Sequence, residues 1–112
     1  MYLFTWPSPR DGGRHGAVHA IDLAFTFGRL DSPGMAEFAG KGPAAEQLSA
    51  NLMDAWHAFA RAGNPSHEGI GTWPRYDGAR RATLLFGESC QVRDAPAEAE
   101  RAIWDDLKGS AA

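Results

Sequence analysis

The sequence predicts an α/β fold, because strand patterns and helix patterns alternate along its 112 residues. Three observations carry this prediction. A short aromatic and apolar run over residues 2–6 is typical of a strand that is buried on both faces. An amphipathic helix is predicted over 43–62, and a strand, a turn and a returning strand are predicted over 82–93.

The N-terminal strand is expected to stop at Pro7, and a loop rich in glycine and charge follows over 8–16. The next stretch, 17–28, has two interpretations. Its apolar residues alternate as they would in a strand, but several of them would also share one face of a short helix. Beyond it a second loop is predicted, with one helical turn at 35–38.

The helix over 43–62 has clear start and stop signals. Pro43 suits the first helical position, where no backbone N–H is needed. Gly63 is placed to end the helix in a left-handed conformation, and Asn64-Pro65 prevents its continuation. One apolar stripe runs along the helix, formed by Leu48, Leu52, Ala55, Trp56 and Phe59.

The C-terminal part begins with an irregular segment over 66–81, in which Trp73 and Tyr76 are the expected anchors. Residues 82–86 are predicted to form a strand, and residues 90–93 the strand that returns beside it. Pro96 is expected to open a last helix. The apolar residues that align along this helix are Ala99, Ile103 and Leu107, with Trp104 beside them.

Composition excludes several classes of function. The net charge of -3 gives no reason to expect nucleic acid or a membrane surface as a partner, and no apolar run is long enough to span a bilayer. Cys90 is the only cysteine, so no internal disulfide can form. Met1 is followed at once by an apolar strand without a signal peptide, which leads us to expect a piece of a larger domain.

Residues 87–89, Gly-Glu-Ser, match the start of the G-x-S-x-G motif that carries the nucleophile of many serine esterases. The fifth position is Gln91, however, and too few residues follow before Pro96 to form the helix that the motif requires. All four histidines also precede Ser89, whereas the histidine of that fold follows its serine. We therefore interpret Ser89 as a turn residue, and Cys90 as a packed strand cysteine.

The four histidines have different settings. His15 and His19 are four residues apart, a spacing that on a helix would suit zinc, but the glycines around them disfavour a helix and no third ligand is apparent. His57 and His67 are expected to be surface or hydrogen-bonded polar residues. His19 follows a strand through a glycine-rich loop, and the carboxyl ends of strands are where α/β enzymes place their chemistry.

Residues 16–28, GAVHAIDLAFTFG, resemble the histidine segment of the type-B carboxylesterase family, which includes the cholinesterases. Ala24 stands where many members have proline. Residues 55–66, AWHAFARAGNPS, resemble the last long helix of the family, and residues 72–77, TWPRYD, its Trp-Pro-x-Tyr segment. The positions of the first segment that match are Gly16, His19, Ala20, Asp22, Leu23, Phe25, Phe27 and Gly28.

This resemblance implies that residues 1–112 are the C-terminal part of a single carboxylesterase domain with the α/β-hydrolase fold. It implies a serine esterase that transfers an acyl group to water and uses no cofactor and no metal. His19 matches the catalytic histidine, while the nucleophile and the triad acid would lie in the N-terminal remainder of the domain. Asp22 is expected to support the loop and not to be the triad acid. The implied partners are a small-molecule carboxylic ester and that remainder.

Two other functions compete with the esterase hypothesis. In the second hypothesis the chain is a stand-alone α/β module without enzymatic activity. Such a module would keep the elements of the fold and would either bind a partner or have no binding function. The third hypothesis is a small metal-binding domain that uses His15 and His19, and it would require tight binding of zinc.

Overall fold

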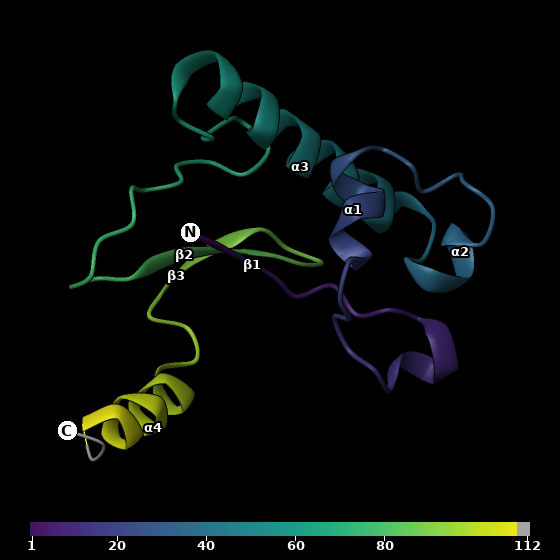
Figure 1. Cartoon of the computed structure of the whole chain (residues 1–112). Coiled ribbons are helices and arrows are strands. Elements are labelled where there is room, and N and C mark those ends of the chain that lie inside the picture. The colour runs from purple at the N-terminus through teal and green to yellow at the C-terminus, as the bar shows by residue number, and fades with distance from the viewer. Residues whose placement is uncertain (110–112) are drawn as a thin grey trace.

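The computed structural model describes residues 1–109, which form a three-stranded sheet with helices around it (Figure 1). Helix α3 passes over one side of the sheet, and α4 extends away from the other (Figure 1). In chain order the elements are β1 Tyr2–Phe4, a 3₁₀ helix Arg10–Gly13, α1 Ile21–Thr26, α2 Met35–Phe38, α3 Pro43–Ala62, β2 Ala82–Phe86, β3 Gln91–Asp94 and α4 Glu98–Gly109.

The sheet has the order β1-β2-β3, with β1 parallel to β2 and β3 antiparallel to β2. Leu3 is opposite Leu85 in the parallel pair. The predicted strand at 2–6 is shorter than expected, and the prediction that both of its faces are buried is wrong for the described chain. Tyr2 and Leu3 are 38% and 46% exposed, and β1 is an edge strand that pairs only with β2 among the described residues.

The core lies between α3 and the sheet and continues to α1. Alanine and leucine side chains of α3 pack on β2, where large apolar side chains project from the pleat, and α1 closes one end. Each of these side chains is at most 6% exposed. The core residues from α1, α3 and β2 are Ile21, Ala24, Phe25, Ala45, Leu48, Leu52, Ala55, Leu84 and Phe86.

Helix α3 has the predicted bounds and the predicted end. Gly63 has φ 69°, and its N–H donates to the carbonyl of Phe59 over 2.7 Å, so the left-handed cap satisfies a terminal carbonyl. The predicted stripe is only partly buried, however. Trp56 and Phe59, in the last two turns of α3, are 37% and 59% exposed, although the ring of Trp56 still packs against the rings of Tyr2 and Phe86.

The ambiguous stretch 17–28 contains a helix, α1, and the expected turn at Met35–Phe38 is α2. The helical interpretation holds because Ile21, Ala24 and Phe25 share one face, and that face is buried against α3. An alternating strand would have divided these apolar side chains between two faces.

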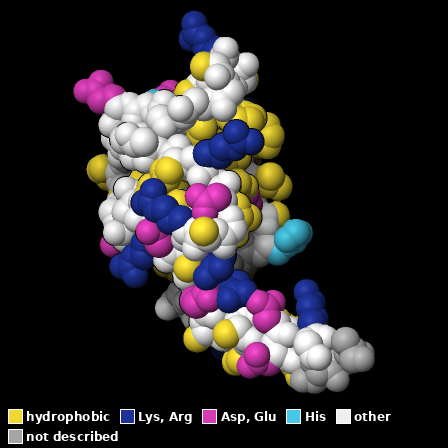
Figure 2. All heavy atoms as spheres, turned by 90° about the vertical axis from the view of Figure 1, so that its left-hand side faces the viewer, with side chains coloured by type: hydrophobic (Ala, Val, Ile, Leu, Met, Phe, Trp, Pro, Cys, Tyr) yellow, Lys and Arg dark blue, Asp and Glu magenta, His cyan; other side chains and the backbone are white. Residues whose placement is uncertain are grey.

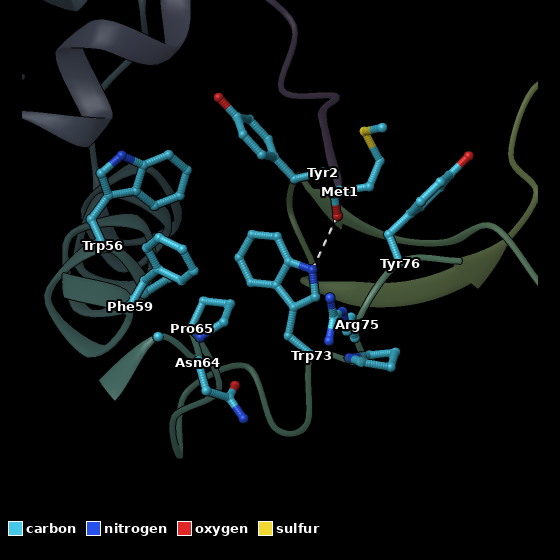
Figure 3. Close-up of a pocket in the computed structure, with 12 residues that line it drawn as sticks. Met1, Tyr2, Trp56, Phe59, Asn64, Pro65, Trp73, Arg75 and Tyr76 are labelled. Atoms are coloured by element: carbon cyan, nitrogen blue, oxygen red, sulfur yellow. Dashed lines mark hydrogen bonds between the residues drawn. The ribbon is translucent and has the colours of Figure 1, made fainter. Parts of the chain in front are cut away.

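The irregular segment has one anchor and not two. Trp73 is buried, and its indole N–H donates to the carbonyl of Met1 over 3.0 Å. Tyr76 is 40% exposed, so its predicted anchoring role is wrong. In Figure 3 the indole of Trp73 lies against Met1, just before β1, whereas the ring of Tyr76 lies apart from the other rings.

The last helix begins at Glu98 and not at Pro96. Ala95 and Ala97 have φ values of 45° and 59°, so the backbone on both sides of the proline is left-handed and cannot belong to an α-helix. Figure 2 shows α4 projecting from the body of the molecule, with apolar and charged side chains interspersed. Ile103, Trp104 and Leu107 are each more than half exposed. Within residues 1–109, no helix combines the length and the apolar composition needed to cross a membrane.

Candidate active site

A loop connects the carboxyl end of β1 to the His19 segment, and Ser8 organises it. The backbone N–H of Ser8 donates to the carbonyl of Gly16 over 3.0 Å, which closes the loop between them. The Ser8 hydroxyl donates to the carbonyl of Phe38 over 2.6 Å and accepts the N–H of Arg10 over 3.3 Å. Ser8 is 1% exposed, so these bonds lie out of water and hold the loop against the α2 turn.

His19 occupies a tight turn immediately before α1. The N–H of Ile21 donates to the carbonyl of Val18 over 3.3 Å, so His19 and Ala20 are the two central residues of the turn. Ala20 has φ 65° and ψ 6°, the conformation that a type II turn requires at its third position and that usually selects glycine. The turn leaves His19 exposed, and its imidazole has no hydrogen bond or ion pair within residues 1–109.

Helix α1 anchors this turn to the core. Ile21 and Phe25 are essentially fully buried, and the hydroxyl of Ser49 in α3 donates to the carbonyl of Phe25 over 2.7 Å. The carbonyl of Phe25 lies at the end of α1, and it accepts this bond together with the N–H of Gly28. The chain leaves at Gly28, where φ is 60° and a Cβ atom would lie 2.9 Å from the Met53 sulfur.

Asp22 lies in the first turn of α1 and is half-buried. Burial raises the pKa of the Tyr2 phenol, and the negative charge of Asp22 raises it further. The negative charge of Asp22 therefore lies near enough to Tyr2, at the start of β1, to disfavour the ionised phenolate. No hydrogen bond joins Asp22 to His19 in the part of the chain that the structure describes, so its expected support of the loop stays a prediction.

The other histidines have separate environments. His15 is exposed, and its Nε2 lies 2.9 Å from a carboxylate oxygen of Asp11. His67 has both ring nitrogens in hydrogen bonds, because Nε2 donates to the carbonyl of Asn51 and Nδ1 accepts the N–H of Gly69. His57 is exposed on α3. Among the described residues, no three His, Cys, Asp or Glu side chains are grouped so as to hold a metal ion.

Ser89 lies in the turn between β2 and β3, as predicted, and is exposed. Cys90 follows it and packs against the core as a half-buried side chain. Burial raises the pKa of its thiol, and the Asn51 amide donates a weak hydrogen bond to its sulfur over 3.5 Å. A raised pKa disfavours the thiolate, which agrees with a packing role for this cysteine.

The structure also contains an aromatic groove of about 800 Å³ that the sequence analysis did not predict. The rings of Tyr2, Trp56, Phe59 and Trp73 surround it, and Arg75 lies at its edge (Figure 3). The first ring belongs to β1, the next two to the end of α3, and the fourth to the segment that leads to β2. Trp56 and Phe59 are visible in the sequence as part of the apolar stripe, but no pattern in the sequence indicates that their rings border a groove.

Comparison with known proteins gives one consistent result. The model of the carboxylesterase family matches residues 1–104. The para-nitrobenzyl esterase of Bacillus subtilis is 35% identical over 109 residues, which are 97% of this chain and 22% of that protein. The phenmedipham hydrolase of Pseudarthrobacter oxydans is 36% identical over 89 residues, which are 78% of this chain and 18% of that protein.

Solved structures agree with the sequence comparison. A carboxylesterase of Geobacillus stearothermophilus superposes with a TM-score of 0.77 at 36% identity, over 93% of this chain and 21% of that one. A thermophilic p-nitrobenzyl esterase gives a TM-score of 0.78 at 31% identity, over 91% of this chain and 21% of that one.

The matching structures are esterases of the α/β-hydrolase class, and the sheet and helices described above are part of that fold, as predicted. The chain belongs to the carboxylesterase family. It spans about a fifth of the length of the two relatives and two structures named above.

Proposed function

We propose that this chain carries the general acid–base histidine, His19, of a carboxylic ester hydrolase with a serine nucleophile. The observation that supports the proposal is the placement of His19. Its imidazole is exposed at the centre of a tight turn, and the turn is fixed on one side by the loop from β1 and on the other by buried α1. A mobile histidine would lack the orientation that proton transfer requires.

The chemistry requires an imidazole that can take up a proton and give it back. His19 takes the proton of the serine hydroxyl as the serine oxygen attacks the ester carbonyl, and it returns this proton to the leaving alcohol. A water molecule then loses a proton to the same imidazole, attacks the acyl-enzyme, and releases the carboxylic acid. The serine and the carboxylate that orients the imidazole would come from the N-terminal remainder of the domain.

We further propose that residues 1–112 form the C-terminal part of one esterase domain, and that this remainder is their partner. The edge of β1 supports this assignment, because parallel strands are normally covered on both faces and paired at both edges. The aromatic groove supports it as well, since solvent-exposed apolar surface of this kind usually marks a contact. The substrate class that we propose is a small-molecule carboxylic ester, as the name of the para-nitrobenzyl esterase indicates for that relative.

A chimera tests the proposal directly. The 112 residues replace the matching C-terminal part of the Bacillus subtilis para-nitrobenzyl esterase, a substitution that the 35% identity over 109 residues makes feasible. We expect the chimera to hydrolyse p-nitrophenyl acetate, and the 112 residues alone to show no turnover above the buffer rate. A chimera that is folded by circular dichroism and yet inactive would contradict the proposal. Turnover by the isolated chain that disappears in Ser89→Ala would contradict it too.

The turn that carries His19 allows a prediction about stability. Ala20 is held at φ 65°, so Ala20→Gly is expected to raise the free energy of unfolding of the chimera by up to about 1 kcal/mol. Ala20→Val is expected to lower it by about 1–3 kcal/mol, because a β-branched side chain is still less compatible with a left-handed backbone.

Urea unfolding of the chimera measures both changes. Ala17→Val is the matched control, because Ala17 is exposed in the same loop and does not have a positive φ. The control is expected to change the free energy of unfolding by less than about 0.5 kcal/mol. Equal effects of valine at 17 and at 20 would show that the turn is not formed as described.

A further inference from the structure

Two buried serines are hydrogen-bonded to the two ends of the His19 segment, residues 16–28. Ser8 is 1% exposed and lies before the segment, and Ser49 is 3% exposed and packs against its end. Both hydroxyls donate to backbone carbonyls of other elements, over 2.6 Å and 2.7 Å. Within residues 1–109, neither serine is hydrogen-bonded to His19, and neither is used by the chemistry proposed above.

Ser8 connects three backbone segments. Its N–H reaches the carbonyl of Gly16, three residues before His19, and its hydroxyl reaches the carbonyl of Phe38 at the end of α2. The same oxygen accepts the N–H of Arg10. Removing the hydroxyl would leave a carbonyl and an N–H without this partner where little water can replace it. The loop that leads to His19 would then lose its attachment to α2.

Ser49 acts at the other end of the segment. Its hydroxyl lies in α3 and holds the carbonyl of Phe25, the buried aromatic residue of α1. Helix α1 has only six residues, Ile21–Thr26, so a shift at its end moves the turn at its start as well. The carbonyl of Phe25 also accepts a hydrogen bond from the N–H of Gly28 over 3.2 Å, so it would still have one hydrogen bond if the Ser49 hydroxyl were removed.

We propose that Ser8 and Ser49 are positioning residues that hold His19 in the orientation required for proton transfer. This inference rests on the proposed function of His19. Small displacements of a catalytic group lower the rate of the chemical step far more than they weaken the binding of the substrate. Loss of either hydroxyl should therefore appear in kcat and not in KM.

The test uses the esterase chimera. Ser8→Ala and Ser49→Ala are each expected to lower kcat for p-nitrophenyl acetate by roughly tenfold to a hundredfold, with KM within about twofold of the unmodified chimera. Thr83→Val is the matched control. Thr83 is also buried, and its hydroxyl also donates to a backbone carbonyl, that of Arg81 over 3.0 Å, but it lies on β2 outside the His19 segment. It is expected to lower the melting temperature to a similar extent and to leave kcat within about twofold.

A double-mutant cycle separates positioning from general damage. In a His19→Ala background, Ser8→Ala is expected to cause no further loss of the residual rate, because there is no imidazole left to position. A tenfold or greater further loss there would overturn the proposal, as would equal effects of Ser8→Ala and Thr83→Val on kcat. If Ser8→Ala does not fold, the same comparisons with Ser49→Ala decide the question. If His19→Ala does not lower the rate of the chimera, the proposed function itself is wrong. This outcome is distinguishable from failure of the positioning proposal, because it needs only the rates of the unmodified chimera and of His19→Ala, with both serines intact.

Discussion

Replacing His19 by alanine in the chimera is expected to lower kcat/KM for p-nitrophenyl acetate by roughly 10⁴-fold or more. Without the imidazole, nothing takes the proton of the attacking serine, and groups that act as a unit lose most of their rate when any one member is removed. A tenfold change in rate corresponds to about 1.4 kcal/mol, so the expected loss exceeds about 5 kcal/mol of transition-state stabilisation. Initial rates over a range of substrate concentrations give kcat and KM separately.

The other three histidines are the controls for this experiment. His15→Ala, His57→Ala and His67→Ala are each expected to stay within roughly tenfold of the unmodified chimera. His15 pairs with Asp11 on the surface, His57 is exposed on α3, and His67 is occupied by two backbone groups. If His15→Ala were as damaging as His19→Ala, the assignment of the acid–base residue within this loop would be wrong.

The isolated 112-residue chain is expected to behave as a molten or associating species. Large apolar side chains on β1, on the end of α3 and on α4 are between 37% and 65% exposed, including Tyr2, Trp56 and Trp104. Each such side chain contributes roughly 1.5–3 kcal/mol when it is fully buried. If half a dozen of them stay exposed to solvent, the stabilising free energy that is lost is comparable to the whole free energy of unfolding of a typical domain, about 5–15 kcal/mol.

Spectroscopy distinguishes this state from an ordered module. We expect helical far-UV circular dichroism from α3, a weak near-UV signal despite the four tryptophans, and strong binding of 8-anilinonaphthalene-1-sulfonate. The chimera, in which these surfaces are covered, is the control and should bind little dye. A monomeric isolated chain with dispersed NMR peaks and a cooperative thermal transition would instead favour a stand-alone module without enzymatic activity.

Much of the local structure follows from the sequence alone. Helix α3 begins at Pro43 and ends before Gly63 because each of these residues has one strongly preferred place in a helix. The pair of strands around Ser89 was predictable because apolar runs on both sides of a short polar turn can form adjacent strands. The family itself was indicated by the segment around His19, and the comparisons confirm it.

Burial is what only the tertiary structure decided. An apolar pattern states which side chains avoid water, but not which of them have a neighbour within this chain. The apolar stripe on α3 is continuous in the sequence, but its residues differ in burial once the chain has folded. Leu52 is fully buried, whereas Phe59 is mostly exposed. In the same way, nothing in the residues 2–6 shows that β1 lies at an edge.

The geometry around His19 also depended on long-range contacts. The choice between strand and helix at 17–28 was settled by α3, because Ile21 and Phe25 reach the core together only from a helix. The bonds of Ser8 to Phe38 and of Ser49 to Phe25 join residues 30 and 24 positions apart, and no local pattern marks either serine. The sequence by itself therefore determined the family, α3 and the histidine segment, whereas packing decided how that segment is held, because hydrogen bonds between distant residues exist only once the chain has folded.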